Sequence, residues 1–390
     1  MINEKDWNQI EISEAVMKRV VERLPRHDAT LVQAFVKRFY AHVPPAELVT
    51  VDDLYGAAVS LWQAGHQRED GQPAIRVYNP QIQDHGWRSR HTVIEIITDD
   101  SPFLIDSLTA ELNRLEVAVH LAIHPVIKIR RNDAGELVAL DSKGHSEAFI
   151  HIQIDQHTAP SFLDNIAHRL IAILADVHKA VADWRPMRAA LADLARDLKN
   201  IASGKKADID EARAFLGWLD SDHFTYLGAV RLKLIGRGRG AQLEREAGSG
   251  LGLLAEENLD VFPELADFGH LPETGHKLML AHEPLLVTKT YMRSTVHRAL
   301  PFDAILVRRK SETGAVIGFD LFIGLLTSAA YDKSVRDIPL LRRKVYEVLD
   351  RARFSPVSHS GKALLHILES YPRDELYQTD TTTLLNTALG

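Results

Sequence analysis

The sequence predicts an α+β fold in which a ferredoxin-like sandwich is followed by a mostly antiparallel β domain, with helical connectors. Between residues 91 and 181, segments with alternating apolar residues and segments with helical periodicity follow the order β-α-β-β-β-α. This order packs most simply as an antiparallel sheet with two helices on one face. A second group of alternating segments, between residues 223 and 325, predicts the second sheet.

Length and composition are those of a globular protein with more than one domain. The chain has 390 residues, of which 45% are hydrophobic and 25% charged, so two domains are expected. The net charge of −7, with acidic and basic residues mixed, argues against nucleic acid or an anionic membrane as a partner. No cysteine is present and no apolar run approaches the roughly 20 residues of a membrane span, so we expect a cytoplasmic location.

The first 65 residues show helical periodicity, after which the period changes to two. Apolar residues recur at helical spacing from Leu31 to Tyr40, and Pro44-Pro45 would stop that helix. Thr50 is the expected cap of a second helix, Val51–Gly65. Further along, strands are predicted at Ala74–Tyr78, His91–Ile97, Val117–Arg130 with a bend at Pro125, Glu136–Leu140 and Ala148–Asp155, and a long helix at 161–181.

Beyond Val181 the predicted elements are a helical connector, the second sheet and further helices. The connector covers Met187–Asn200, and another helix covers Asp208–Leu219. Strands of the second domain are predicted at His223–Leu234, Leu285–Thr290, Ala304–Arg309 and Val316–Leu325, followed by helices at Val335–Arg353 and Gly361–Ser370 and a polar end.

The polar elbow after the strand His91–Ile97 is the candidate binding site. Asp99, Asp100, Ser101 and Pro102 stand where amide groups at a helix start could hold an anionic group, while the two acids bind an amino group. The same residues have a plainer interpretation, because acids and serine before a helix commonly cap it. Every helix needs a cap and few bind ligands, so capping is the more common role.

Motifs for other chemistry are weak, and no catalytic, cofactor-binding or metal-binding residue can be assigned. No G-x-S-x-G, H-E-x-x-H or G-x-x-x-x-G-K-[ST] pattern occurs. His120 and His124 are four residues apart, but on a strand this spacing separates them by about 13 Å, too far for one metal ion. The glycine clusters at 236–240 and 248–252 are expected to be loops, and the basic helix Arg336–Arg353 also carries acids, as solvated faces do.

Four segments resemble the amino-terminal region of the large NAD-specific glutamate dehydrogenases of bacteria. They are TDDSPFLIDSL (98–108), HFTYLGAVRL (223–232), LFIGLLTSAAYDKSVRDIPLLRRKV (321–345) and FSPVSHSGKALLHILESYPRDELYQ (354–378). The resemblance runs over most of the chain. It implies an enzyme that interconverts glutamate and 2-oxoglutarate with NAD, and whose catalytic domain lies far downstream. The chain would then be a fragment with no cofactor of its own, inactive alone.

The resemblance also implies a layout of domains. A helical segment would cover residues 1–29, an ACT-like domain 30–185, a helical connector 186–204, a PAS-like domain 205–335, and a second connector 336–390 toward missing downstream domains. ACT domains elsewhere bind amino acids at a strand–helix elbow and at subunit interfaces, which is where Asp99–Pro102 fall. An ordinary ACT domain ends with a strand after its second helix, whereas this chain continues as helix beyond Val181.

Two functions of different class follow, and assembly is slightly favoured over sensing. As an assembly module, the chain would use sheet edges and the face around Leu340–Val348 to form a homo-oligomer together with the remainder of its own chain. As a sensor, it would bind an amino-acid effector at the elbow or in the second domain and bias subunit packing. A third alternative is an unrelated enzyme, with His223, Tyr226, Tyr291 and His297 lining a pocket in the second domain.

Overall fold

The chain divides into two compact units, each with a six-stranded antiparallel sheet. The computed structural model describes residues 9–41, 51–141, 143–198, 205–256, 261–266 and 268–389. The first unit contains Met1–Val177 with Thr295–Arg298, and the second contains His178–Ser294 with Ala299–Gly390. The predicted combination of helices with antiparallel sheets is confirmed. Within the described ranges, no helix has the length and apolar character needed to cross a membrane.

The sheet of the first unit has the strand order β1-β2-β6-β4-β5, and β3 pairs with β6 as well. Its strands are β1 (Ala74–Tyr78), β2 (Thr92–Asp99), β3 (Val119–Ile123), β4 (Val126–Arg131), β5 (Leu137–Ala139) and β6 (His145–Ile154). The predicted strand 117–130 is divided at Pro125, as proline would require, and both halves pair with β6.

Strand β1 occupies the edge of the sheet beside β2. It runs antiparallel to β2, with Ala74 opposite Ile97 and Tyr78 opposite Val93. An ordinary ACT domain takes its last strand from after the second helix, but here α6 (Pro160–Ala182) leads directly into α7 (Trp184–Asp197). A strand that precedes the sandwich in sequence therefore completes the sheet.

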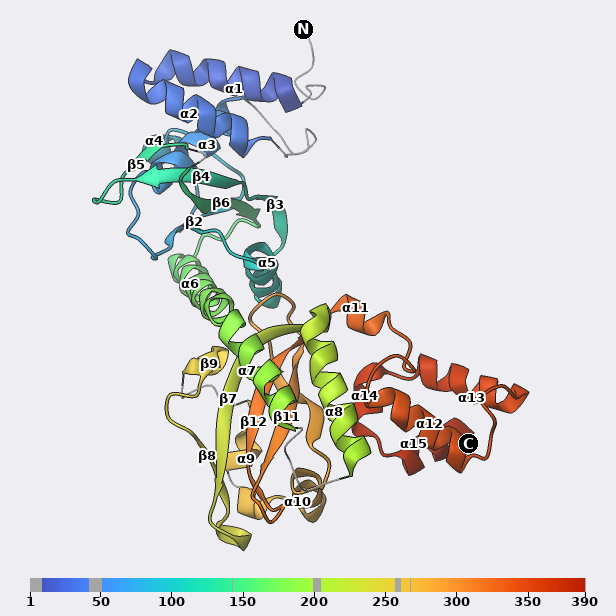
Figure 1. The fold of residues 1–390 in the computed structure, drawn as a ribbon. Coiled ribbons are helices and arrows are strands. Elements are labelled where there is room, and N and C mark those ends of the chain that lie inside the picture. The colour runs from blue at the N-terminus through green and yellow to red at the C-terminus, as the bar shows by residue number, and fades with distance from the viewer. Residues whose placement is uncertain are drawn as a thin grey trace. The chain divides into compact units, whose positions relative to one another are not determined.

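Helices cover both faces of this sheet (Figure 1). On one face lie α5 (Leu104–Arg114) and α6, the two helices predicted there. On the other lie α1 (Gln9–Arg23), α2 (Arg26–Phe39) and α3 (Val51–His66), followed in sequence by the short α4 (Ile82–His85). Phe35 of α2 meets Phe149 of β6 with 5.2 Å between ring centroids. Seven of the eight residues of β2 are consequently buried. The predicted stop at Pro44-Pro45 and the cap Thr50 lie outside the described residues.

The sheet of the second unit has the order β10-β11-β12-β7-β8, and β9 also pairs with β7. The predicted strands of this domain are confirmed, and the end predicted as polar contains two short helices. The elements are α8 (Lys206–Trp218), β7 (Phe224–Ile235), β8 (Gln242–Arg245), β9 (Leu251–Gly252), α9 (Pro263–Ala266), α10 (Glu273–Met279), β10 (Leu285–Arg293), β11 (Pro301–Lys310), β12 (Val316–Leu326), α11 (Ser328–Tyr331), α12 (Leu341–Arg351), α13 (His359–Ser370), α14 (Arg373–Gln378) and α15 (Thr381–Leu389).

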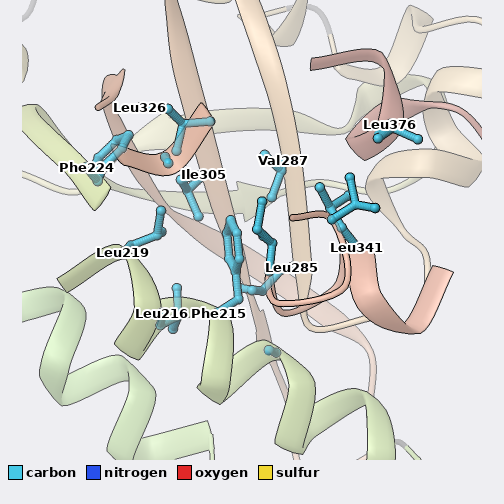
Figure 2. Packing of buried hydrophobic residues seen from close by; sticks show 14 of the residues in the cluster. Phe215, Leu216, Leu219, Phe224, Leu285, Val287, Ile305, Leu326, Leu341 and Leu376 are labelled. Carbon is cyan, nitrogen blue, oxygen red and sulfur yellow. The ribbon is translucent and has the colours of Figure 1, made fainter. Parts of the chain in front are cut away.

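The core of the second unit joins its helices to the sheet (Figure 2). Phe215 and Leu216 of α8 pack with Leu285 of β10 and Ile305 of β11 in one buried cluster. The apolar side chains of α12 belong to the same cluster. The apolar side chains of the face around Leu340–Val348 are therefore mainly core residues, and the use of this face as an assembly surface stays a prediction.

Candidate functional site

The elbow follows β2 directly, but α5 does not begin next to the four candidate residues Asp99–Pro102, because Phe103 separates them from its first residue. The helix starts at Leu104, and the cap position is Phe103, whose backbone is left-handed with φ 70°. Among the described residues, the side chain at the cap position makes no hydrogen bond to the amides of this end. The interpretation of Asp99 and Asp100 as helix caps is therefore wrong.

Asp99 takes part in a buried ion-pair network instead. It lies at the end of β2 opposite Glu147 of β6, and Arg68 Nη2 donates to the carboxylates of both residues. The side chain of Arg68 is only 2% exposed, although it lies in the connection between α3 and β1. The network thus ties this connection to the middle of the sheet.

Glu147 is the centre of the network. Its side chain is fully buried and accepts hydrogen bonds from Arg68 (2.7 Å), from Arg131 of β4 (2.8 Å to each oxygen) and from His145 (2.8 Å). Burial alone would raise the pKa of Glu147, but the hydrogen bonds from Arg131, Arg68 and His145 outweigh burial and lower it to about 2. Glu147 is consequently ionised at neutral pH, and the two arginines compensate its charge and that of Asp99.

Other donors of the two arginines hold the backbone around the network, although Nε of Arg68 is buried without a hydrogen-bond partner among the described residues. Arg131 donates to the carbonyl oxygens of Gly65 (2.8 Å) at the end of α3 and of Gly135 (2.8 Å) in the turn after β4. Arg68 donates to the carbonyl oxygen of Gln72 at 2.9 Å. These contacts hold the turn at 132–135 against the sheet. They support a structural role for the two arginines.

The same cluster resembles a metal site only in its spacing. Ligand atoms of Asp99, His145 and Glu147 lie within 4.8 Å of one another. Both oxygens of Glu147 already accept from guanidinium groups, so a divalent cation would lie against two fixed positive charges. These three residues do not fit a metal ion.

A cavity of about 250 Å³ lies beside the elbow, on the α5 side of the sheet. Two of the four candidate residues, Asp100 and Ser101, line it, whereas Asp99 and Pro102 do not. The hydroxyl oxygen of Ser101 is buried and has no hydrogen-bond partner among the described residues. The other lining residues are Phe103, Leu104, Ile105, Asp106, His124, Val126, Ala148 and Ile150.

The four residues proposed to line a pocket in the second domain do not share one environment. His223 stacks on Trp218 at 4.3 Å between ring centroids, and the hydroxyl of Tyr226 donates to Asp220 at 3.4 Å. Tyr291 is 91% exposed on β10. His297 belongs to the first unit. These contacts do not support a common active site.

The glycine clusters do not fit an NAD cradle. Binding of the pyrophosphate requires a tight turn from a strand into the start of a helix. Gly236–Gly240 instead connects the antiparallel strands β7 and β8, and Gly252 belongs to β9 beside β7. The first cluster is thus a loop with a short 3-10 turn at Gly238–Gly240, as predicted, whereas the second runs from a loop into β9 at Leu251–Gly252.

Sequence reasoning missed the buried charges, although one of them leaves a signal. Glu95 interrupts the apolar run Val93–Ile97, and a carboxylate in a buried strand needs a cationic partner. Arg76, directly opposite on β1, supplies that partner. Arg68 and Glu147 leave no comparable signal, because they are 79 residues apart.

Comparison with known proteins shows which class of protein this arrangement belongs to. Residues 35–170 match the family model described as the ACT1 domain of glutamate dehydrogenase, and residues 338–390 match helical motif 1 of glutamate dehydrogenase. The first match includes β1 to β6, the elbow, α5 and the first part of α6. The chain thus contains the ACT1 domain and the helical motif of the glutamate dehydrogenase type.

Relatives named NAD-specific glutamate dehydrogenase are similar along most of the chain. The protein of Halomonas elongata is 35% identical over 393 residues, 98% of this chain and 24% of its own length. That of Pseudomonas aeruginosa is 33% identical over 92% of this chain and 22% of its own, and that of Mycobacterium tuberculosis 28% over 88% and 20%. The predicted resemblance to the amino-terminal region of these enzymes is confirmed. The chain spans about a quarter of the length of these relatives.

Proposed function

We propose that this chain is a non-catalytic part of an NAD-dependent glutamate dehydrogenase, where it serves assembly and regulation. The whole enzyme would deaminate glutamate oxidatively to 2-oxoglutarate and ammonia. NAD would bind to the remainder of the protein, since the glycine clusters of this chain do not fit it. The names of the relatives support the reaction and the cofactor.

The observation that carries the non-catalytic role is the pairing of buried acids. The buried carboxylates of the described residues are Glu95, Glu111, Glu147, Asp303 and Asp320, and each has an ion-pair partner. A general acid or base must be able to exchange a proton with substrate. Acids held by arginine or lysine in this way stabilise a fold instead.

Direct assay tests the non-catalytic role. The purified chain is expected to form no NADH from NAD and glutamate above the rate of a heat-inactivated sample. The full-length enzyme of a relative, assayed in parallel, establishes that the conditions support the reaction. A rate above the heat-inactivated sample that scales with chain concentration would contradict the proposal.

For assembly, the edge strand β10 is the best candidate surface. It ends the sheet order of the second unit, so one side of its backbone has no partner among the described strands. Tyr291 on this strand is 91% exposed and its neighbour Met292 36% exposed. Large apolar side chains on an exposed strand edge favour association with another chain, and we propose a second copy of this chain as the partner.

Light scattering coupled to gel filtration tests this surface. The chain is expected to form an oligomer whose fraction increases with concentration, and Tyr291→Ser should shift it toward monomer. Tyr346→Ser is the matched control, because Tyr346 is 51% exposed but lies on α12. A monomer at every concentration, or equal effects of both substitutions, would refute the use of this edge.

A second candidate function, amino-acid sensing, is favoured by the cavity at the elbow. The unpartnered hydroxyl of Ser101 and the exposed carboxylate of Asp100 could receive the polar groups of an amino acid. Calorimetric titration with a panel of free amino acids should then detect binding that Asp100→Asn and Ser101→Ala weaken. Asp133→Asn, in a turn outside the cavity, should leave binding unchanged. No binding at millimolar concentration would exclude the elbow as a sensor.

We also propose that the second unit is PAS-like. The supporting feature is its strand order. Counted from β7 as the first strand, the hairpin partner β8 lies on one side, and the last strand β12 lies on the other, followed by β11 and β10. When the two-residue strand β9 is left out of the count, this order is 2-1-5-4-3, the arrangement expected of a PAS-like sheet. An experimental structure with a different strand order would refute the assignment.

A further inference from the structure

A second cavity of the first unit, about 510 Å³ in volume, lies on the face of the sheet that α1–α3 cover. This volume is within the range of small-molecule sites. The cavity is distinct from the one at the elbow, because His151 and Gln153 of β6 line it, whereas Ala148 and Ile150 line the other. Alternate residues of a strand face opposite sides of a sheet.

Two hydrogen-bond donors beside this cavity lack an acceptor. The indole Nε1 of Trp87 and Nδ1 of His151 are both buried without a partner among the described residues. An indole N–H can only donate. His151 Nε2 lies 3.2 Å from the amide nitrogen of Gln153, so the neutral ring accepts there and carries its proton on Nδ1. Burial lowers the pKa of His151 to about 4, which keeps the ring neutral at pH 7.

The rest of the lining adds positive charge. Arg88 and Arg90 come from the loop before β2, and in the part of the chain that the structure describes neither has an acidic partner. His91 and His120 lie beside them, with 4.4 Å between ring centroids. Asp53 is the one carboxylate among these lining residues, and it already interacts with another group of the protein. The charged side chains of the lining are thus the two arginines and Asp53, which leaves an excess of positive charge.

A β-bulge contributes to this arrangement. In the pairing of β3 with β6, Val119 is opposite Ile154 and Leu121 is opposite Gln153, so His120 has no opposite residue. Bulges redirect a side chain and are frequent next to binding sites. Here the bulge brings His120 to the cavity, where its Nε2 also contacts Asp155 at 2.7 Å.

We propose that this cavity binds a small organic anion. Arg88 and Arg90 hold its carboxylate or phosphate group, and its apolar body lies against Trp87 and Leu54. Such a ligand supplies the acceptors that the unpartnered donors lack. Ordered water is the alternative occupant, because one or two water molecules would also satisfy Trp87 Nε1 and His151 Nδ1. Arg88 and Arg90 are exposed and can be solvated in either case, so the experiment has to distinguish an anion from water.

Three probes with the same aromatic body separate charge from shape: phenyl phosphate, benzoate and the neutral benzyl alcohol. The indole N–H resonance of Trp87 in the full chain, identified by its loss in Trp87→Phe, reports binding directly by NMR. Phenyl phosphate or benzoate is expected to move this resonance with saturation, and the comparison of the two shows whether phosphate or carboxylate is preferred. Benzyl alcohol should not move it.

Substitutions then test the arginines. The double substitution Arg88→Gln with Arg90→Gln is expected to weaken binding at least about tenfold, which corresponds to 1.4 kcal/mol. Arg130→Gln, on the exposed side of β4 and outside the cavity, should leave it unchanged. Far-UV circular dichroism of each variant verifies the fold. If neither anion binds at millimolar concentration, if benzyl alcohol binds equally well, or if the double variant binds as the parent does, the proposal is wrong.

Discussion

Arg131 holds Glu147 by two parallel hydrogen bonds, from Nε to Oε1 and from Nη2 to Oε2, each 2.8 Å long. Both side chains are nearly or fully buried. A guanidinium group matches the two oxygens of a carboxylate in this geometry, which lysine cannot reproduce. The pairing of β4 with β6 ends at Ile129 of β4. The contact of Arg131 with Glu147 continues to hold the two strands together beyond that residue.

Removing the carboxylate should be costly. Glu147→Gln would leave Arg68 and Arg131 buried without their main counter-charge, so the free energy of unfolding should fall by about 3 to 5 kcal/mol. Urea denaturation followed by circular dichroism measures the change. Asp133→Asn, at an exposed position of the nearby turn, should alter it by less than about 0.5 kcal/mol. Equal stabilities of the two variants would show that the network contributes little.

The network also predicts a dependence of stability on pH. The pKa of Glu147 is lowered from 4.5 to about 2 in the folded state, so the unfolded chain binds a proton at higher pH than the folded chain does. The stabilisation is therefore complete above pH 4.5 and is lost as the pH falls toward 2, and the difference corresponds to about 3 kcal/mol. Urea denaturation across this range should show a steeper loss in the parent than in Glu147→Gln.

The end of α5 offers a stabilising substitution. Glu116 is exposed and has a left-handed backbone with φ 58°. It belongs to a Schellman motif, in which its amide donates to the carbonyl oxygen of Asn113 and the amide of Val117 donates to the carbonyl oxygen of Leu112. Glycine adopts this conformation without strain, so Glu116→Gly should raise the unfolding free energy by up to about 1 kcal/mol. Glu116→Ala serves as the control, since alanine keeps the strain. A gain with alanine as large as with glycine would contradict this explanation.

Two helical glycines should respond to alanine with opposite signs. A Cβ atom at Gly56 of α3 would lie 2.2 Å from Cβ of Trp87, whereas at Gly217 of α8 nothing lies within 4 Å. Alanine favours a helix over glycine by about 1 kcal/mol, so Gly217→Ala should raise the urea midpoint. Gly56→Ala should lower it, because Trp87 must move in a packed interior. An increase of the urea midpoint for both variants would mean that Trp87 can shift at little energetic cost.

Local sequence patterns predicted most helices and strands, but they did not predict which distant segments pair or pack together. The bend at Pro125 and four of the six strands of the second sheet follow from residue types within a few positions, whereas the short strands β8 and β9 were not predicted. The start of α5 was misplaced, because Phe103 carries a left-handed backbone that no local preference favours. The covering of the second face by α1–α3, the link from Arg68 to Glu147 and the cavity lined by Trp87 and His151 depend on residues tens of positions apart. Periodicity carries no information on such contacts.

The place of β1 in the sheet has a consequence for the order in which the chain can fold during synthesis. Every strand of the first sheet is made before α6. All strands of this sheet therefore leave the ribosome before any residue of the second unit does. The edge of β2 can be paired with β1 from the start, without a strand from later in the chain. Since nascent chains grow at about 5 to 20 residues per second, this spares an unpaired strand several seconds of exposure to neighbouring chains.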